Sequence, residues 1–282
     1  MKKTALVTGF DNSIIARETA LKLIKLGYRV IATYEENRFN DEFLKIHNLD
    51  NEILFEQVDM HCKDSINELI SRISDYSFNA IINCYATLST KPTGELRNEF
   101  LDFDYDSFNS VVSKNITSLA AICIGLKDSI SQGGCIINIT SSAAEEGAFA
   151  TISYNLSKAA VKSLTQSLAN NFGTYKEVRV NCVAPGWIPQ SKDVVAGNIV
   201  ELANKITPLS NYGNAENVVE AIISLLENPY ANNVNYSVDG GITSSYLMYM
   251  LEAVELYGIN TDYIMKDLIN QISSVKDHLK NE

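Results

Sequence analysis

The sequence predicts an α/β fold: a doubly wound parallel sheet of about seven strands with helices on both faces. Two observations carry this prediction. Short apolar runs alternate with longer amphipathic runs along most of the chain, and apolar runs such as Ala80-Ile81-Ile82 and Ile136-Ile137 lack polar alternation. Alternating strands and helices form right-handed βαβ units, and strands covered on both faces are apolar throughout.

The first strand and helix show how each element is delimited. A β-rich run over 3–8 ends at Gly9, and Asp11, Asn12 and Ser13 offer N-cap side chains for a helix over 14–26. Gly27 ends that helix. By the same signals, further strands are expected at 28–33, 53–58, 80–84, 135–140, 178–183 and 234–238, and further helices at 64–73, about 105–131, 153–172 and 215–226.

After Gly240-Gly241 the alternation gives way to two amphipathic helices, so we divide the chain into a sheet domain at 1–241 and a C-terminal helical extension at 242–282. Each helix carries an apolar face that has to be covered. The two faces are Leu247, Met250, Leu251, Val254 and Tyr257, and Met265, Leu268, Ile269, Ile272, Val275 and Leu279. Three roles remain open: extra cover for the core, a lid over a functional site, and a contact with another subunit.

Composition bounds the function. Hydrophobic residues make up 46% of the 282 residues, enough for a large core, and the formal net charge is −11. A chain this acidic lacks the positive surface that nucleic acid and anionic membranes bind, so neither partner is expected. No apolar run in the sequence has the length of a membrane span. The five cysteines are scattered without metal-site spacing, so we expect reduced thiols, no metal and a cytoplasmic protein.

Tyr154 and Lys158 stand four residues apart at the start of a predicted helix, which places both side chains on one face. A nearby ammonium favours the phenolate, so we expect Lys158 to lower the pKa of Tyr154 from about 10 toward the range of a general acid or base. Taken alone, the pair also fits a half-buried Tyr beside a solvated Lys. The motifs around it favour the catalytic interpretation.

Those motifs follow the predicted strand ends in a fixed order. They are Thr8-Gly9 after the first strand, Asp59 after the third, Asn83-Cys84-Tyr85-Ala86 at the fourth, Asn115 in the next helix, Ser141 after the fifth strand, Pro185-Gly186 after the sixth and Val238-Asp239-Gly240-Gly241 at the seventh. Over residues 1–241 this order resembles the short-chain dehydrogenase/reductase family, in its single-domain branch with a Tyr-x-x-x-Lys motif. That family usually has Asn-Asn-Ala-Gly at the fourth strand.

The resemblance implies a Rossmann-like fold and an NAD(P)-dependent oxidoreductase that moves a hydride between nicotinamide and a secondary alcohol or ketone. It implies that Tyr154 gives or takes the proton, that Lys158 holds the nicotinamide ribose, and that Ser141 hydrogen-bonds the substrate oxygen. Asn115 is implied to hold a water that relays protons. Alternatively, Ser141 is an ordinary hydroxyl at a strand end and Asn115 a residue at a helix kink. The implied partners are a small-molecule alcohol or ketone and further copies of the chain, in a homodimer or homotetramer.

The cofactor-binding turn departs from the family pattern. The family's Thr-Gly-x-x-x-Gly-x-Gly lets a pyrophosphate approach a helix N-terminus, but here Ser13 and Ile15 replace the second and third glycines, and Asp11 adds a negative charge. The run Ser13-Ile14-Ile15-Ala16 is similar to the family's enoyl-reductase members, whose Tyr and Lys are spaced more widely. The residues that the resemblance assigns to the cofactor are Thr8, Gly9, Asn12, Ser13, Ile14, Tyr34, Glu35, Asp59, Met60, Asn83, Tyr154, Lys158, Pro185, Gly186 and Ile188.

Glu35 gives a slight preference for NAD over NADP. An acid at the end of the second strand accepts from a ribose 2′-hydroxyl, whereas a Tyr followed by a basic residue is typical of NADP-binding members. Tyr34 fits the second pattern, but the carboxylate of Glu35 would repel a 2′-phosphate, unless Arg38 reaches back to it. The segment 187–206 is expected to form the substrate loop, with Trp187 as a wall of the pocket.

Two other functions remain open. The altered glycine turn is compatible with a protein of this fold that binds nucleotide weakly or not at all. Such a protein would be a non-redox enzyme, as in the halohydrin-dehalogenase-like branch, or a non-catalytic scaffold. That branch typically pairs Tyr with Arg, whereas this chain has Lys158, and a scaffold has no use for the set Asn115, Ser141, Tyr154 and Lys158. Both observations favour the oxidoreductase.

Overall fold

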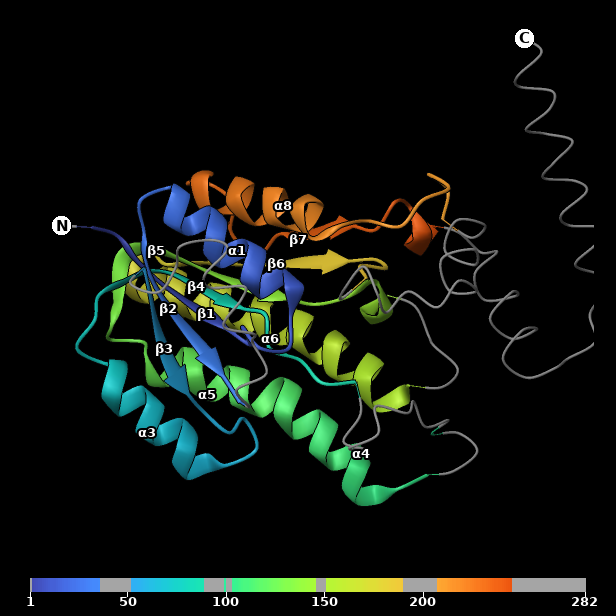
Figure 1. Cartoon of the computed structure of the whole chain (residues 1–282), viewed down its shortest axis with the longest axis horizontal. Coiled ribbons are helices and arrows are strands. Elements are labelled where there is room, and N and C mark those ends of the chain that lie inside the picture. Colours follow the sequence, from blue (N-terminus) through green and yellow to red (C-terminus); the bar gives the residue numbers. More distant parts are fainter. Residues whose placement is uncertain are drawn as a thin grey trace, which may run out of the picture.

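The computed structural model describes residues 2–35, 52–88, 99, 103–145, 151–189 and 207–244, and these residues contain a seven-stranded sheet. The strands lie in the order β3-β2-β1-β4-β5-β6-β7, and each neighbouring pair is parallel (Figure 1). They are β1 (Thr4–Thr8), β2 (Arg29–Tyr34), β3 (Ile53–Gln57), β4 (Phe78–Asn83), β5 (Ile130–Ile139), β6 (Arg179–Pro185) and β7 (Asn235–Val238). The predicted doubly wound fold is confirmed.

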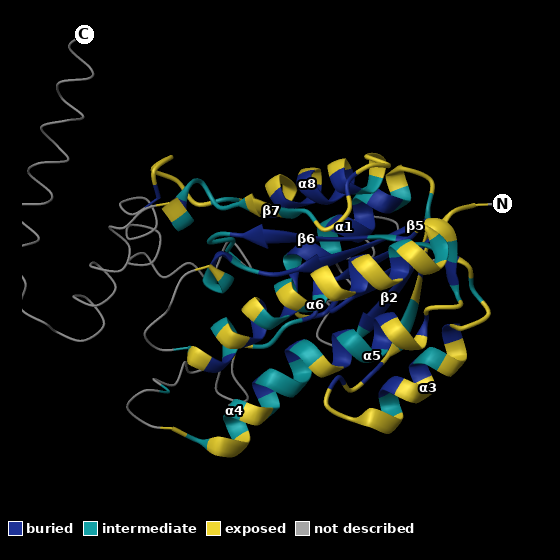
Figure 2. Cartoon of the chain, turned by 180° about the vertical axis from the view of Figure 1, so that it is seen from behind, coloured by how far each residue is buried: buried dark blue, intermediate teal, exposed yellow. Residues whose placement is uncertain are grey.

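Helices cover both faces of the sheet (Figures 1 and 2). On one face lie α1 (Ile14–Lys25) and α8 (Ala215–Glu227), which contact each other. On the other lie α3 (Lys63–Ile73), α4 (Tyr105–Val112), the π-helical turn η1 (Ser113–Thr117), α5 (Ser118–Gly125) and α6 (Ile152–Lys176). Each face has its own buried cluster: in β1, Val7 belongs to one and Leu6 to the other. Because neighbouring residues of a strand face opposite sides, the central strands are apolar throughout.

The order of the strands reverses at β1, which lies between β2 and β4 although the chain passes from β1 to β2 and β3 before it returns to β4. In open α/β sheets a crevice forms outside the carboxyl ends of the strands at such a point, and ligands bind there. Thr8, Tyr34 and Asn83 end β1, β2 and β4. The residues that follow these three therefore line the crevice.

The main difference from the predicted elements lies between residues 105 and 140. The helical region expected over about 105–131 is α4, η1 and α5 in succession and ends at Gly125, and β5 begins at Ile130. Gly133 has a φ of 70°, and the register between β4 and β5 shifts near Phe78, so the early part of β5 is irregular. α6 continues to Lys176, where Glu177 ends it in the left-handed conformation. The other boundaries agree within two residues.

Two predicted segments fall largely outside the described residues. These are the helical extension, of which the structure describes only as far as the short turn η3 (Ile242–Ser244), and the loop 187–206, described only to residue 189. Arg38 also lies outside them. Within the described ranges, the helices are too short or too polar to cross a membrane.

Candidate active site

Ser141, Tyr154 and Lys158 come together beside the carboxyl end of β5. Ser141 is the N-cap of the short helix η2 (Ser142–Ala144), and its Oγ accepts from the backbone N–H of Ala143 at 3.2 Å. It also hydrogen-bonds the phenol of Tyr154, which lies in the first turn of α6. One turn later, the Nζ of Lys158 is 5.6 Å from the centre of the Tyr154 ring. Three of the four predicted catalytic side chains are therefore neighbours.

Burial governs the charges of this group. Lys158 is 2% exposed, its Nζ donates to the carbonyl oxygen of Ile139 at 2.8 Å, and burial lowers its pKa to about 8. Burial raises the pKa of Tyr154, and the hydrogen bond with Ser141 acts in the opposite direction. The expectation that Lys158 lowers the pKa of Tyr154 is therefore wrong here, because burial outweighs other effects and the Lys158 ammonium is directed to the Ile139 carbonyl.

Asn115, the fourth predicted catalytic residue, is buried in η1 and joins three segments. Its Oδ1 accepts from the backbone N–H of Thr87 at 2.8 Å, and its Nδ2 donates to the Thr87 carbonyl and to Ser157 Oγ, both at 2.9 Å. The Ser157 hydroxyl donates in turn to the carbonyl of Tyr154 at 2.7 Å. These contacts tie the segment after β4 to α6, and the π-helical turn matches the helix-kink alternative.

The first turn folds without its second and third glycines because their replacements have other roles. The Ser13 Oγ accepts from the backbone N–H of Ala16 at 3.3 Å and so caps α1. Ile15 is 6% exposed and packs in the cluster between α1 and the sheet. Asp11 is buried, and its Oδ2 accepts from the backbone N–H of Glu35 at 3.0 Å. Its carboxylate thus joins the end of β1 to the end of β2.

Gly9 is the one glycine of this turn that remains, and the structure shows why. It has a φ of 77°, and a Cβ added there would lie 2.7 Å from the Cα of Tyr85. The backbone N–H of Tyr85 also donates to Thr8 Oγ1 at 3.2 Å. The segment after β4 therefore lies directly against the end of β1, and only glycine leaves room for it.

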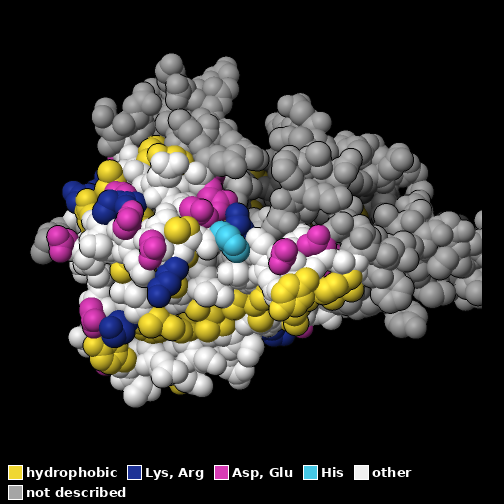
Figure 3. Space-filling view, turned by 90° about the horizontal axis from the view of Figure 1, so that it is seen from below, with side chains coloured by type: hydrophobic (Ala, Val, Ile, Leu, Met, Phe, Trp, Pro, Cys, Tyr) yellow, Lys and Arg dark blue, Asp and Glu magenta, His cyan; other side chains and the backbone are white. Residues whose placement is uncertain are grey.

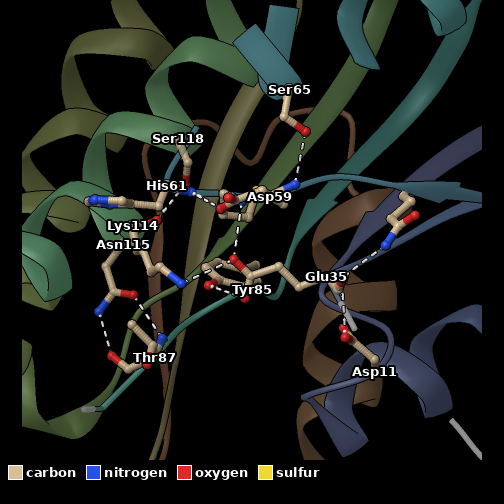
Figure 4. Close-up of polar contacts among 12 residues, drawn as sticks. Asp11, Glu35, Asp59, His61, Ser65, Tyr85, Thr87, Lys114, Asn115 and Ser118 are labelled. Atoms are coloured by element: carbon tan, nitrogen blue, oxygen red, sulfur yellow. Dashed lines mark hydrogen bonds and ion pairs between the residues drawn. The ribbon is translucent and has the colours of Figure 1, made fainter. Parts of the chain in front are cut away.

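The carboxylate of Glu35 accepts hydrogen bonds from three donors at the carboxyl edge of the sheet (Figure 4). Its Oε1 accepts from Lys114 Nζ at 3.1 Å and from the backbone N–H of Met60 at 3.2 Å, and its Oε2 accepts from the Tyr85 hydroxyl at 2.9 Å. Burial raises the pKa of Tyr85, and Glu35 raises it further, so the phenol stays protonated and donates. Sequence reasoning misses Tyr85 and Lys114 as site residues. The departure from Asn-Asn-Ala-Gly marks Tyr85, whereas no sequence pattern marks Lys114.

The other predicted cofactor residues lie around the same edge of the sheet. Asp59 is exposed, and its Oδ1 accepts from the backbone N–H two residues later at 2.8 Å. Asn83 is buried and donates to Asn138 Oδ1 at 2.8 Å, beneath the crevice. Gly186 approaches Asp239 so closely that a Cβ added to Gly186 would lie 2.7 Å from the Cα of Asp239. Of the remaining predicted residues, Ile14, Tyr34 and Pro185 lie at element ends, Asn12 lies in the turn before α1, and Ile188 follows β6.

The residues around the crevice fit a dinucleotide in their chemistry. On the β5 side, the cation of Lys158 and the hydroxyls of Ser141 and Tyr154 converge, as the nicotinamide ribose and a substrate oxygen require. On the β2 side, Glu35 is an acid at a strand end, the residue type that accepts from an adenosine ribose hydroxyl. The Tyr85 hydroxyl already occupies that carboxylate.

Comparisons with known proteins agree with this geometry. A family model described as enoyl-(acyl carrier protein) reductase matches residues 10–243. Carbonyl reductase family member 4 of Danio rerio is 35% identical over 134 residues, 47% of this chain and 55% of the relative, so this chain spans about half the length of that relative. The 3-oxoacyl-[acyl-carrier-protein] reductase FabG of Chlamydia pneumoniae is 27% identical over 86% of this chain and 97% of its own. A short-chain type dehydrogenase/reductase structure from Mycobacterium ulcerans superposes with a TM-score of 0.76 at 22% identity, over 89% of this chain and 94% of that one, and supports the fold.

Proposed function

Because this chain belongs to the short-chain dehydrogenase/reductase family of oxidoreductases, whose match covers residues 10–243, we propose that it transfers a hydride between NAD(P) and a secondary alcohol or ketone. The observation that carries the proposal is the grouping of Ser141, Tyr154 and Lys158 at the carboxyl edge of the sheet. A hydride transfer to a carbonyl carbon needs a proton for the oxygen, and these residues can supply it.

The raised pKa of Tyr154 fits the role of proton donor that ketone reduction requires. A Tyr154 phenol whose pKa is raised stays protonated at neutral pH and is ready to donate. A ketone oxygen between Ser141 and Tyr154 would accept a hydrogen bond from the first and a proton from the second. Bound nicotinamide would supply the hydride. The pKa of Lys158 is about 8, and a ribose hydroxyl that accepts a hydrogen bond from its ammonium would raise that pKa.

We propose a carbonyl-bearing small molecule as the substrate. The relatives from Danio rerio and Chlamydia pneumoniae carry the names carbonyl reductase and 3-oxoacyl-[acyl-carrier-protein] reductase. The description of the family model names an enoyl reductase, but the spacing of Tyr154 and Lys158 by four residues is the spacing of the carbonyl-reducing members. The ketone is therefore the first substrate class to test.

A second candidate function is a protein of this fold with weakened nucleotide binding. The observation that favours it is the hydrogen bond from Tyr85 to Glu35, which occupies the carboxylate expected to meet the adenosine ribose. One measurement separates the oxidoreductase from a protein with weakened nucleotide binding. Titration with NADH and NADPH changes the nicotinamide fluorescence if the dinucleotide binds.

The variant Tyr154→Phe tests the proposed chemistry. We expect turnover of a ketone panel, including a 3-oxoacyl thioester, to fall by about two to four orders of magnitude, because a positioned acid is lost while the apolar ring remains. The melting temperature should change little. Tyr230→Phe, at a side chain that is 97% exposed, is the control and should keep full activity. Near-normal turnover in Tyr154→Phe would contradict the assignment.

A further inference from the structure

The hydrogen bond between Tyr85 and Glu35 crosses the end of β1. Tyr85 follows β4, Glu35 follows β2, and these two strands are the neighbours of β1 on its opposite sides. A side chain at the end of β4 that reaches a side chain at the end of β2 must therefore pass over the carboxyl end of β1. Figure 4 shows Tyr85 and Glu35 in contact, with Asp11 on one side and Lys114 on the other.

The bridge is well satisfied. The carboxylate of Glu35 accepts from the Tyr85 hydroxyl, from Lys114 and from the backbone N–H of Met60, and the backbone N–H of Glu35 donates to Asp11. Glu35 and Lys114 side chains are 21% and 22% exposed, so their ion pair is shielded from water. Tyr85 is 7% exposed and packs in the buried cluster on the α5 face. These bonds are partly buried, and a hydrogen bond to a charged group is stronger than one between neutral groups.

A dinucleotide in a doubly wound sheet runs across this same point, with its pyrophosphate at the first turn and its adenosine ribose at the acid after the second strand. Resting on the proposed function, we propose that Tyr85, Glu35 and Lys114 form a bridge that closes the adenosine half of the crevice in the free protein and must open before a dinucleotide binds. The nicotinamide half, built from Ser141, Tyr154 and Lys158, stays formed in either state.

This arrangement makes Tyr85 a determinant of cofactor affinity. When a binding-competent state is only partly populated, the apparent affinity falls by that fraction. Tyr85→Phe removes the bond and keeps the ring, whereas Tyr85→Ala also removes the volume. The first change should tighten binding at the adenosine half by about tenfold to 150-fold, the range expected for one hydrogen bond to a charged group. The second should tighten it by at least as much.

Three probes separate the two halves of the crevice. ADP-ribose contains the adenosine half, nicotinamide mononucleotide contains the nicotinamide half, and NAD contains both. Dissociation constants from calorimetry for the full chain and both Tyr85 variants give the test. A matched control is Tyr175→Phe, because the Tyr175 hydroxyl donates to an Asp128 carboxylate oxygen at 2.9 Å on the exposed side of α6, away from the crevice.

The bridge predicts tighter ADP-ribose and NAD in Tyr85→Phe, unchanged nicotinamide mononucleotide, and no change in Tyr175→Phe. Unchanged or weaker ADP-ribose binding in a folded Tyr85→Phe would overturn it. Should Tyr85→Ala fail to fold, as a melting curve would show, Tyr85→Phe alone decides. Absence of NAD binding in wild type and all variants would overturn the proposed function along with the bridge, whereas NAD binding that Tyr85 does not affect would overturn the bridge alone.

Discussion

Lys158 carries a cost in stability that follows from its burial. Its pKa lies at about 8 in the folded chain and at 10.5 in the unfolded chain. Between these values the unfolded state binds more protons, so the free energy of unfolding rises with pH. The penalty is complete below pH 8 and disappears above pH 10.5. A residue kept for function at a cost to stability is common at active sites.

This cost can be measured as a difference between two variants. From pH 7.5 to 9.5, the Lys158 contribution should raise the free energy of unfolding by about 2 kcal/mol. Lys158→Met removes this rise, while Lys162→Met, at a lysine on the same helix that pairs with Glu145 at the surface, should keep it. Urea unfolding at both pH values checks this. Equal pH responses in wild type and Lys158→Met would refute the buried charge.

A second prediction at the residue scale concerns Glu35 and the choice of dinucleotide. We propose that its carboxylate favours NAD, but Lys114 lies 3.1 Å away and offsets part of its charge. Glu35→Gln keeps the shape, removes the charge and frees Lys114 to attract a phosphate. The ratio of the NADP to the NAD dissociation constant should therefore fall by about tenfold, as expected for one shielded charge.

Glu145→Gln is the control for this change, since Glu145 pairs with Lys162 at 2.5 Å on the surface of the molecule. It should leave the ratio as in wild type. A ratio that stays constant in Glu35→Gln would show that Glu35 does not meet the ribose. Calorimetric titration with both dinucleotides gives the required constants.

The sequence predicts the members of the site better than their contacts. Ser141, Tyr154 and Lys158 are neighbours, as their motif order indicates. The Tyr85–Glu35–Lys114 contacts join residues 50 and 79 positions apart, and no local spacing rule reaches so far. The direction of the Lys158 side chain, toward Ile139, depends on burial in the assembled core and not on its position in the helix.

At the scale of elements, local chemistry explains most boundaries. Ser13 and Asn214 cap α1 and α8, as residues of these types do. The helices predicted over about 105–131 end earlier, at Gly125, because the loop before β5 leaves no mark in an apolar pattern with helical periodicity. The start of β5 was predicted five residues too late, at residue 135, for a related reason. Gly133 and Gly134 are typical of a turn but here lie within an irregular strand.

The end of α8 depends on a side chain from another element. The guanidinium of Arg179, at the start of β6, donates to the carbonyl oxygens of Leu225 at 2.6 Å, Leu226 at 2.8 Å and Ala231 at 3.2 Å. The last carbonyls of a helix have no partner within the helix, and a cation there also favours the helix dipole. Arg179 thus fixes α8 to the sheet.

Arg179→Met should therefore lower the free energy of unfolding by about 2–4 kcal/mol, because charged hydrogen bonds are lost and carbonyls are left unpaired. Denaturant unfolding is the measurement. Arg72→Met is the control: Arg72 pairs with Glu56 at 2.8 Å and is 43% exposed, so its loss should cost about 1 kcal/mol or less. Equal losses in both variants would contradict the role given to Arg179.

At the scale of the whole molecule, one face of the α/β layers carries an apolar band. Figure 3, seen from below, shows hydrophobic side chains gathered in a band across the face where α3, α4 and α5 lie in Figure 1. Phe103, Tyr105 and Ile124 on or beside these helices are 60%, 71% and 52% exposed. Contiguous apolar patches of this kind mark contacts between proteins. We propose that this face joins subunits in a homodimer or homotetramer.

The double variant Tyr105→Asp, Ile124→Lys tests that proposal. Charges placed in an apolar contact should dissociate the assembly, so light scattering should give a smaller mass than wild type. Tyr230→Asp, at an exposed aromatic beyond α8, is the control and should keep the wild-type mass. A monomeric wild type, or a double variant of unchanged mass, would rule out this face as the contact.

The π-helical turn η1 has a consequence for how this gene can vary. A π-turn holds one residue more than the α-helical path between the same two points. Lys114 and Asn115 are adjacent within it, and they contact Glu35 and Thr87 in different parts of the crevice. Deleting one codon there would leave the α-helical path between the same two points, so the flanking turns would keep their phase, but the bulge that presents Lys114 and Asn115 together would be lost. A substitution at Lys114 or Asn115 removes one contact at a time, whereas a change in the length of the segment removes the contacts to Glu35 and Thr87 together.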